Sequence, residues 1–414
     1  MARPSLELPA SAVGAHHADG VERLARVRDA LGRAALDAVV CTLPTNVLLL
    51  SGYWPVVGTA CAVVWRKGPA LLILPNDELE LAAQAWADEI CIMDAGDDDL
   101  VAALSAQLAD AAERWRGVRI GVERGPASQP VSYAAMCIYG ASTWDAAARA
   151  WPAATLVPAD GLLSDLRTLK TPGEISVVAA ACDIAGHAFA QAGAILRPGL
   201  RESEAAASLR TALDTAVVGE HDRAAGFVFC MSGANAAEAY RAYARSSAKP
   251  LARGDLVLVH CNSHLNGYWT DITRTYCLGA PDGRQRTMYE AVFAARQAAL
   301  GVIRPGVTAR SVDHAARATL GDRGFGDAFK HGLGHGVGFA AIDHTAHPRL
   351  APTSKDVLEH GMVCNIEPAI YLEGYGGIRH CDVVAVTESG AEVLTPFQAS
   401  PEALALSDAL PSAT

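Results

Sequence analysis

The second half of the chain places a carboxylate inside a strand pattern that is otherwise apolar. The run Leu256-Val257-Leu258-Val259-His260 is typical of a buried strand, and a turn rich in Asn and Gly separates it from a second strand-like run that contains Asp271. This pattern predicts an antiparallel hairpin, in which residues equidistant from the turn face each other. His260 and Asp271 are equidistant from Leu265-Asn266, so we expect both side chains to enter one site.

A second predicted hairpin repeats this arrangement further along the chain. Glu367 and Cys381 are equidistant from Gly374, which lies in a turn-prone run rich in glycine. His335 lies in a separate glycine-rich segment that begins at His331. His, Asp, Glu and Cys side chains bind divalent transition ions, and a buried carboxylate needs a partner or a metal. The sequence therefore predicts one buried metal site with five dispersed ligands: His260, Asp271, His335, Glu367 and Cys381.

A change of pattern along the chain predicts two domains. The length of 414 residues exceeds one ordinary core, and 51% hydrophobic against 19% charged residues is typical of a packed globular protein. Residues 1–165 alternate apolar strands with helices, which favours an α/β domain, whereas residues 170–400 combine long helices with hairpins, which favours an α+β domain. We place the boundary near Leu162–Thr171, because Pro172 and Glu174 begin a new helix.

The expected elements follow from hydrophobic periodicity and turn residues. In the first domain we expect helices at 21–36, 77–87 and 98–116, and strands at 38–41, 61–65, 70–74, 89–93 and 118–122. In the second we expect helices at 173–195, 203–219, 283–303 and 309–323, and hairpins at 255–278 and 361–387. Residues 1–20 and the tail from about 399 are expected to be loosely ordered.

Composition excludes several classes of partner. The net charge of −11 argues against nucleic acid, because phosphate binding needs clustered Lys and Arg. We find no apolar run near the ~20 residues that cross a bilayer, and no signal peptide at the N-terminus, so we expect no membrane association. The ten cysteines are scattered without framework spacing, which favours reduced thiols in a cytoplasmic protein.

Taken together, these motifs resemble the pita-bread metallohydrolase family, which includes prolidase, aminopeptidase P, methionine aminopeptidase and the metal-free creatinase. The first domain is similar in pattern to the creatinase/prolidase N-terminal domain, notably at 46–52. The resemblance implies an α/β N-terminal domain followed by an α+β pita-bread (creatinase/aminopeptidase-like) C-terminal domain. In the second half it covers about 170–395 and rests on five segments in the family's order: 254–255, 267–275, 331–338, 365–371 and 376–379.

Peptidases of this family hold two metal ions with two Asp, one His and two Glu residues. By resemblance, Asp271 matches the bridging Asp, His335 the His and Glu367 the first Glu. His260 stands where the family has its first Asp, and Cys381 where it has its last, bridging Glu. Imidazole and thiolate are softer than carboxylate, so we expect one or two ions, with the preference moved from Mn²⁺ toward Zn²⁺ or Fe²⁺.

Four further residues are candidates for catalysis or substrate contact. Arg379 resembles an Arg that orients a ligand or a substrate carboxylate, and it shares a strand face with Cys381. Tyr240 stands where prolidase-like enzymes have a substrate-contacting His; alternatively it only fills that volume. His331 is either catalytic or a loop-stabilising residue, and His344 follows the glycine-rich segment at a spacing two residues longer than in the family.

The resemblance implies a metal-dependent hydrolase that cleaves a C–N bond in a small amide or dipeptide, with Xaa-Pro peptidase as the commonest activity of the family. One alternative is a creatinase-like amidinohydrolase with no metal or a single metal, in which Cys381 and a nearby His form a nucleophile pair. Another is a non-catalytic binding protein of the same fold. The resemblance also implies a homodimer.

Overall fold

The computed structural model describes residues 19–55, 60–93, 100–124, 140–216, 222–242 and 245–406. These residues form two compact units, which are considered separately. The first contains the described residues up to 176 together with Asp343–Ala346, and the second contains the described residues of 177–342 and of His347 onward. The expected loose segment at 1–20 lies almost entirely outside the described residues. The tail expected from about 399 is described as far as 406, and this part contains a short helix (Pro401–Leu404) and a paired strand (Ala405–Leu406), contrary to the expectation. The domain boundaries drawn from the sequence stay predictions.

The first unit is built on a six-stranded mixed sheet of order β4-β3-β2-β1-β5-β6. Pairing is antiparallel between β1, β2 and β3 and parallel elsewhere. The expected strands are present with shifts of one residue at most. Their bounds are β1 (Ala38–Cys41), β2 (Cys61–Trp65), β3 (Ala70–Pro75), β4 (Glu89–Met93), β5 (Arg119–Val122) and β6 (Thr155–Pro158).

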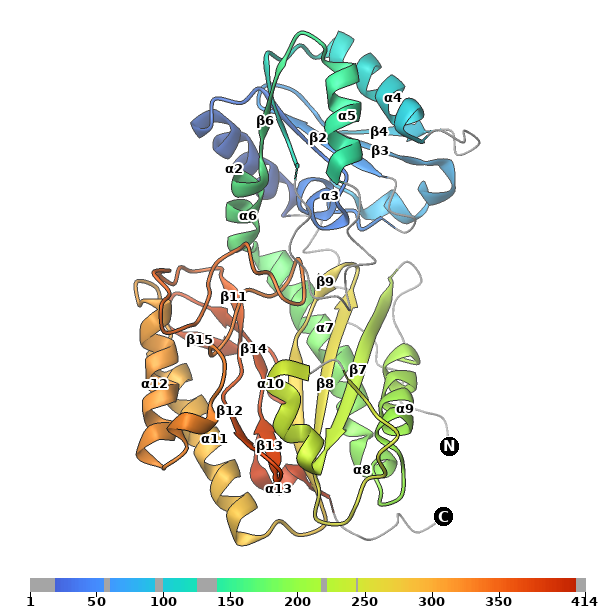
Figure 1. The fold of residues 1–414 in the computed structure, drawn as a ribbon. Helices are drawn as coiled ribbons and strands as arrows, with labels where there is room; N and C mark the ends of the chain where they lie inside the picture. The colour runs from blue at the N-terminus through green and yellow to red at the C-terminus, as the bar shows by residue number, and fades with distance from the viewer. Residues whose placement is uncertain are drawn as a thin grey trace. The chain divides into compact units, whose positions relative to one another are not determined.

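Helices of the first unit cover this sheet. They are α2 (Gly20–Arg33), α3 (Pro44–Ser51), α4 (Leu100–Arg114), α5 (Gly140–Ala150) and α6 (Asp160–Thr168). Figure 1 shows α4 and α5 side by side over the strands. Alternate residues of β1, β2 and β3, such as Val40, Val63 and Leu71, form a core with Leu108 and Ala147 of these helices. This alternation is what a sheet with one face against two helices requires.

The expected helix at 77–87 is wrong. The segment instead contains two short 3-10 turns, Asn76–Glu78 and Leu81–Gln84. Trp86 explains the difference, because its backbone N–H donates to Ser51 O at 2.8 Å and its ring is buried against Gly52. A Cβ at Gly52 would lie 2.6 Å from that ring, so tertiary packing of the Trp overrides local helix propensity.

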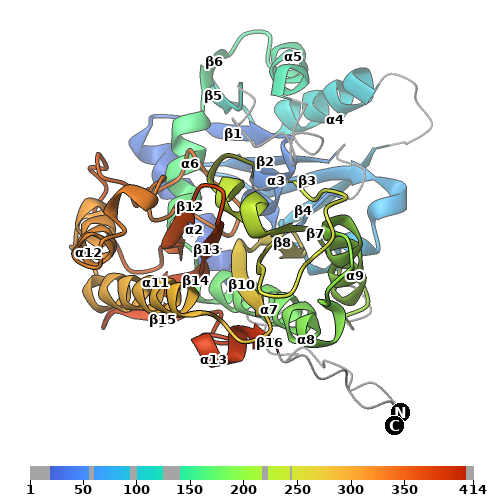
Figure 2. The ribbon, with the colours of Figure 1, turned by 60° about the horizontal axis from the view of Figure 1, so that its bottom comes forward.

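The second unit combines three small sheets with helices, which confirms the expected α+β character. One sheet has the order β16-β10-β8-β7, with β9 beside β8; the others are β11-β14-β15 and β12-β13. Figure 2 shows α9 beside β7, and α11 with α12 on the side of the β11–β15 strands. The strands are β7 (Ala224–Ser232), β8 (Leu256–Leu265), β9 (Tyr268–Trp269), β10 (Ile272–Leu278), β11 (Val363–Ile366), β12 (Ala369–Leu372), β13 (Gly376–Arg379), β14 (Asp382–Val386), β15 (Ala391–Val393) and β16 (Ala405–Leu406).

The helices of the second half begin close to their expected positions. Asp282 caps α11 by accepting a hydrogen bond from Gln285 N at 2.8 Å, and Thr308 caps α12 in the same way. The bounds are α7 (Pro172–Ala190), α8 (Ala192–Ile195), α9 (Glu202–Asp214), α10 (Ala239–Ala242), α11 (Gly283–Val302), α12 (Ala309–Asp322) and α13 (Pro401–Leu404), with 3-10 turns at Gly233–Glu238 and Gly326–Ala328.

The prediction that no apolar run is long enough to cross a membrane is wrong for one helical stretch. Within the described residues, Pro172–Ile195 meets that criterion by length and composition. However, 56% of its most apolar window is buried inside the protein. Because a core helix of a soluble protein has the same composition, this stretch is weak evidence for a membrane span.

The first hairpin has a different register from the expected one. Leu265 pairs with Tyr268, which leaves a two-residue turn of Asn266 and Gly267, both with positive φ. Turns of this type match the twist of antiparallel strands, and Asn-Gly is their preferred sequence. His260 therefore pairs with Thr273 rather than with Asp271. A shift of two residues keeps each side chain on its face of the sheet, so His260 and Asp271 still point to the same side.

The second hairpin has the expected register. Asn365 pairs with Val383 and Ala369 with Arg379, so Glu367 and Cys381 stand at corresponding positions between the two ladders. A bridge between Cys381 and Thr273 links this hairpin to the first one. The two hairpins thus meet at the residues for which a site was predicted.

Candidate active site

Five side chains converge where the two hairpins meet. His260 lies on β8, Asp271 just before β10, His335 in the loop after α12, Glu367 between β11 and β12, and Cys381 between β13 and β14. The side chains of His260 and Asp271 are each 2% exposed, those of His335 and Glu367 each 12%, and Cys381 is fully buried. Titratable groups this deeply buried are rare unless they are paired or functional.

The glycine-rich loop can place His335 here because it packs directly on β11. A Cβ at Gly334 would lie 2.0 Å from Asn365 O, so only glycine allows this approach. Asn365 then holds the loop on both sides of the His: its Oδ1 accepts from His335 N at 2.7 Å, and its own N donates to His335 O at 3.0 Å.

Asp271 is the centre of the cluster. Its Oδ1 is 3.7 Å from His260 Nδ1 and 3.6 Å from Cys381 Sγ. On the other side, its Oδ2 is 3.7 Å from His335 Nε2, and that nitrogen is 3.8 Å from Glu367 Oε1. The structure therefore brings together all five residues that the sequence analysis selected as metal ligands; their role as ligands stays a prediction.

Burial and mutual repulsion dominate the electrostatics of this cluster. Burial raises the pKa of Glu367 to about 7; Arg379 lowers this pKa and Asp271 raises it. Burial, with the carboxylates of Asp271 and Glu367, also raises the pKa of the Cys381 thiol well above its usual range. Burial lowers the pKa of His260 to about 4. In the absence of a cation, the cluster favours uncharged forms of these groups.

Arg379 borders the cluster, as expected from its shared strand face with Cys381. Its Nε donates to Thr273 Oγ1 at 3.0 Å and is 3.9 Å from Glu367 Oε2. Burial alone would lower the pKa of Arg379, but Tyr371, Glu367 and Asp271 together raise it above its usual value. Its Nη2 is buried and has no hydrogen-bond partner among the described residues.

His331 and Tyr240 both contact Tyr371. Tyr371 Oη is 3.0 Å from His331 Nε2, and the Tyr240 ring packs on the Tyr371 ring with centroids 5.6 Å apart. Burial and nearby Arg379 lower the pKa of His331 to about 4. Whether His331 and Tyr240 act on a substrate stays a prediction.

His344 is placed differently from the other candidates. It is exposed and lies in Asp343–Ala346, which belongs to the first unit. That segment is anchored by Asp343, whose carboxylate is 2.8 Å from Arg167 Nε. The catalytic role of His344 stays a prediction.

The sequence analysis did not single out three residues that contact the cluster or the other candidate residues. Thr273 bonds His260 and Arg379, Asn365 bonds His335 and Cys381, and Tyr371 bonds His331. Asn365 and Thr273 each stand two residues from a predicted ligand on a strand, so alternation would have placed them on the same face. Tyr371 lies on β12, and no local sequence signal indicates its bond to His331.

A second buried charge centre lies directly behind the cluster. Asp382, fully buried, accepts from Arg274 Nη2 at 2.7 Å, from Thr395 Oγ1 at 2.8 Å and from Arg296 Nε. Arg274 also donates to Cys381 O at 2.7 Å. These arginines hold the pKa of Asp382 well below its usual range against the effect of burial. This centre positions the backbone that carries Cys381.

The donor atoms can be compared with the geometry of a metal site. Donors bound to one ion at about 2.0–2.3 Å stand roughly 3.3–3.8 Å apart at the edges of a tetrahedron. The separations of 3.7 and 3.8 Å between Asp271, His335 and Glu367 lie at the wide end of that range. Among the described residues no three such side chains already stand close enough to enclose an ion. Their chemistry, two carboxylates and an imidazole, is that of a metal site, and their role as ligands stays a prediction.

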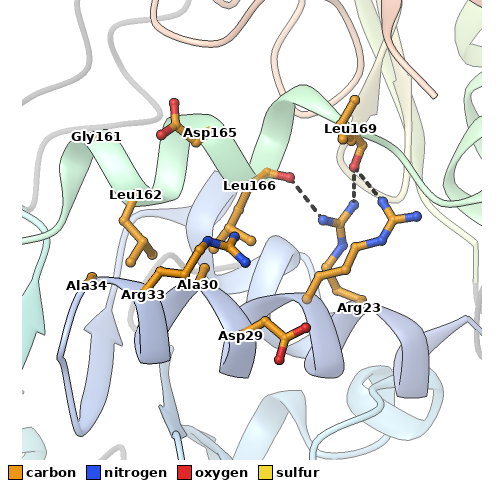
Figure 3. A pocket seen from close by; sticks show the side chains of 11 residues that line it. Arg23, Asp29, Ala30, Arg33, Ala34, Gly161, Leu162, Asp165, Leu166 and Leu169 are labelled. Carbon is orange, nitrogen blue, oxygen red and sulfur yellow. Dashed lines mark hydrogen bonds between the residues drawn. The ribbon is translucent and has the colours of Figure 1, made fainter. Parts of the chain in front are cut away.

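A cavity of about 800 Å³ lies elsewhere, in the first unit between α2 and α6. Figure 3 shows Arg23 reaching from α2 toward the carbonyls of Leu166 and Leu169, to which it donates at 2.9 Å. Arg23 also pairs with Glu174. The residues that line this cavity include none of the predicted site residues. The candidate active site is therefore the five-residue cluster of the second unit.

Two dipeptidases with known names are similar to this chain in sequence. The chain is similar to Xaa-Pro dipeptidase of Pyrococcus furiosus, with 37% identity over 57% of this chain and 65% of that protein, which is just under two thirds of its length. It is also similar to Xaa-Pro dipeptidase of Pyrococcus horikoshii, with 27% identity over 90% of this chain and 97% of that protein.

Solved structures show the same two-domain fold. The structure of Xaa-Pro dipeptidase from Bacillus anthracis matches with a TM-score of 0.75 and 27% identity, over 91% of this chain and 98% of that one. The prolidase from Pyrococcus horikoshii matches with a TM-score of 0.72 and 27% identity, over 90% and 98%. The predicted fold class is thereby confirmed.

Two family descriptions account for most of the chain. The Creatinase/Prolidase N-terminal domain matches residues 23–169. Metallopeptidase family M24 matches residues 177–388, just over half of the chain, and this segment contains the whole cluster. With both hairpins, the glycine-rich loop and the convergent side chains inside the matched segment, the chain belongs to metallopeptidase family M24.

Proposed function

We propose that this protein is a metal-dependent hydrolase that cleaves a C–N bond in a dipeptide or small amide, with Xaa-Pro dipeptides as the first substrates to test. The observation that carries the proposal is the position of His335 Nε2, which lies 3.7 Å from Asp271 Oδ2 and 3.8 Å from Glu367 Oε1 in a buried cluster. The Xaa-Pro dipeptidases to which the chain is similar support the choice of substrate class.

Asp271, His335 and Glu367 would hold the divalent ion that the family implies. When bound, such an ion supplies Lewis acidity toward a carbonyl oxygen and acidifies a water molecule. Asn365 orients His335 by accepting from its backbone N–H. His335 Nδ1 faces Gly336 O at 3.1 Å, so this nitrogen carries the proton, and Nε2 accepts from Asn365 Nδ2 at 3.2 Å beside the carboxylates of Asp271 and Glu367.

The remaining residues bind substrate and move a proton. Arg379 directs its Nη2 to the carboxylate of a dipeptide substrate, since this donor has no partner within the described protein. His331 Nδ1 faces Gly332 O at 2.8 Å, so Tyr371 donates its hydroxyl proton to Nε2. This His–Tyr pair provides the proton for the leaving amine, and Tyr240 contacts the substrate beside it.

A reconstitution experiment tests the proposal. The chelator-treated full chain is loaded separately with Zn²⁺, Fe²⁺ and Mn²⁺ and assayed with Xaa-Pro dipeptides, dipeptides without proline and a guanidino compound. We expect dipeptide cleavage that chelator abolishes and metal restores. Turnover of the guanidino compound with chelator present would instead support a creatinase-like amidinohydrolase. No turnover of any compound with any metal would support a non-catalytic binding protein.

Two further proposals concern the state of the protein in the cell. We propose a cytoplasmic protein, because the nine described cysteines are all free thiols. We also propose a homodimer, on the resemblance to the family. Light scattering after size-exclusion chromatography measures the mass directly, and a mass equal to the 43.2 kDa of one chain would contradict the dimer.

A further inference from the structure

We propose that Glu202 is a positioning residue of the candidate active site, which holds Tyr240 where this side chain contacts the substrate. Glu202 is the first residue of α9 and is fully buried. It acts on the segment that carries Tyr240, residues 232–242 and 245–247, which we call the Tyr240 loop. The inference rests on the proposed hydrolysis of a dipeptide or small amide and adds a residue to the substrate-binding side of that site.

The carboxylate of Glu202 binds both ends of the Tyr240 loop. At the first end, Oε1 accepts from Ser232 N at 2.7 Å and from Ser232 Oγ at 2.9 Å. At the other end, Oε2 accepts from Ser247 N at 3.0 Å and from Ser247 Oγ at 2.5 Å. Asn235 Nδ2, inside the loop, lies 3.0 Å and 3.1 Å from the two carboxylate oxygens. One buried side chain therefore joins the beginning, the interior and the end of the loop.

These contacts require a charged carboxylate at position 202. Burial acts to raise the pKa of Glu202, but hydrogen bonds from Ser247, Asn235 and Ser232 lower it below its usual value. Both carboxylate oxygens face main-chain N–H groups, which can only donate. A glutamine has one accepting oxygen and one NH₂ group, so it would leave one of these two N–H groups without an acceptor. Glu202→Gln thus loosens the base of the loop at almost unchanged side-chain volume.

The Tyr240 loop also packs closely on β13, the strand that ends at Arg379. A Cβ at Gly377 would lie 2.3 Å from Ala236 O, so only glycine permits this approach. Gly377 pairs with Tyr371 across the β12–β13 ladder, and the same Cβ would lie 2.8 Å from the Tyr371 ring. The loop therefore rests on the two strands that carry Arg379 and Tyr371.

Tyr240 is the residue through which the loop reaches the candidate active site. The 3-10 turn Gly233–Glu238 leads directly into α10, which contains Tyr240. The Tyr240 ring packs on the Tyr371 ring, whose hydroxyl lies 3.0 Å from His331 Nε2. Tyr240 is only half-buried, which leaves it accessible to a ligand. The described hydrogen bonds of the Glu202 carboxylate involve none of the five cluster residues, so loosening the loop should displace Tyr240 and leave the cluster unchanged.

A double-mutant cycle tests whether Glu202 acts through Tyr240. The values of kcat and KM for the best dipeptide are measured for full-length wild type, Glu202→Gln, Tyr240→Ala and the double variant, each loaded with the same metal. We expect Glu202→Gln to raise KM by about tenfold and to change kcat by less than about twofold. In the Tyr240→Ala background the same substitution should have no further effect, because its route to the substrate is already lost.

The matched control is Glu204→Gln, which changes an exposed carboxylate on the same turn of α9. Its side chain accepts only from Arg201 N, and glutamine keeps an accepting oxygen, so kcat and KM should equal those of wild type. An equal rise of KM in both backgrounds of the cycle would overturn the inference, as would an unchanged KM in Glu202→Gln. If Glu202→Gln does not fold, Asn235→Ala loosens the same base from within the loop and should raise KM in the same Tyr240-dependent way.

Hydrogen exchange followed by mass spectrometry separates this inference from the proposed function, because it needs no substrate. In Glu202→Gln we expect faster exchange than in wild type over 233–242, with the exchange of β8 and β10 unchanged. Faster exchange over 233–242 without hydrolysis of any compound would sustain the role of Glu202 in holding the loop and refute the hydrolase. Unchanged exchange together with hydrolysis would refute this inference and sustain the hydrolase.

Discussion

Two buried carboxylates of the second unit, Asp382 on β14 and Glu367 beside β11, have pKa values that are shifted in opposite directions. Asp382 accepts hydrogen bonds from two arginines and a threonine, and its pKa is held well below the usual range. Glu367 stands near Asp271 with Arg379 at 3.9 Å, and its pKa is raised to about 7. Burial acts on both residues, so the difference comes from their neighbours.

The comparison separates a carboxylate that stabilises the fold from one that is available for chemistry. Asp382 has every oxygen satisfied within the protein, which is what a structural ion pair requires. Within the described part of the chain Glu367 has no comparable set of donors, so a cation or substrate would compensate its charge. The two centres are joined by Cys381, whose carbonyl accepts from Arg274 and whose thiol contacts Asp271.

Replacing the structural carboxylate should have the largest effect on the fold. Asp382→Asn leaves Arg274 and Arg296 buried without a counter-charge, and we expect it to lower the free energy of unfolding by about 3–5 kcal/mol. Urea denaturation followed by circular dichroism measures this change. The exposed Asp183 on α7 supplies the control, because Asp183→Asn should stay within about 0.5 kcal/mol of wild type. A loss below about 1 kcal/mol for Asp382→Asn would break the comparison.

Replacing Glu367 should reduce the activity strongly and leave the free energy of unfolding unreduced. We expect Glu367→Gln to lower kcat/KM for the best dipeptide by about 10²–10³-fold, equivalent to about 2.7–4 kcal/mol. The free energy of unfolding of the chelator-treated variant should equal or exceed that of wild type, because the change removes a buried charge close to Asp271. Parallel kinetics and denaturation test both halves. Destabilisation as large as that of Asp382→Asn would contradict a functional role.

A smaller change sharpens the structural side of the comparison. Thr395 donates to Asp382 Oδ1 at 2.8 Å and accepts from Val383 N at 3.1 Å. Thr395→Val should lower the free energy of unfolding by about 1–2 kcal/mol, because these two hydrogen bonds are lost. The number of metal ions bound per chain, counted after chelator-treated protein is loaded with Co²⁺, should be unchanged. Denaturation and metal analysis of the same preparation test this. A change in ion number would show that the two centres are not separable.

The smallest expected effect concerns a carboxylate of the first unit, Asp343, whose pKa is also lowered by a neighbouring arginine. Burial alone would raise the pKa of Asp343, but Arg167 holds it well below the usual range. A lowered folded pKa contributes stability above the unfolded value near 3.9, and this contribution is lost as the pH falls. The difference in stability between wild type and Asp343→Asn should therefore narrow by about 1 kcal/mol between roughly pH 4.5 and 3. A constant difference across this window would argue against the ion pair.

Local patterns predicted much of the fold. The strands at Ala38–Cys41, Cys61–Trp65 and Glu89–Met93 have the expected bounds, because their short apolar runs end at turn residues. The helix expected at 77–87 failed because burial of Trp86 against Gly52 depends on residues distant in sequence. The hairpin register was shifted because the expected turn centre ignored the preference of Asn266-Gly267 for positive φ.

The chain by itself determined which side chains stand in the cluster, because strand alternation puts His260 and Asp271 on one face and hairpin symmetry pairs Glu367 with Cys381. Only the tertiary structure decided what each side chain does there. The bonds from Thr273 to His260 and from Asn365 to Cys381 join different strands and loops. Hydrogen bonds act over about 3 Å, so such partners follow from packing and not from spacing along the sequence.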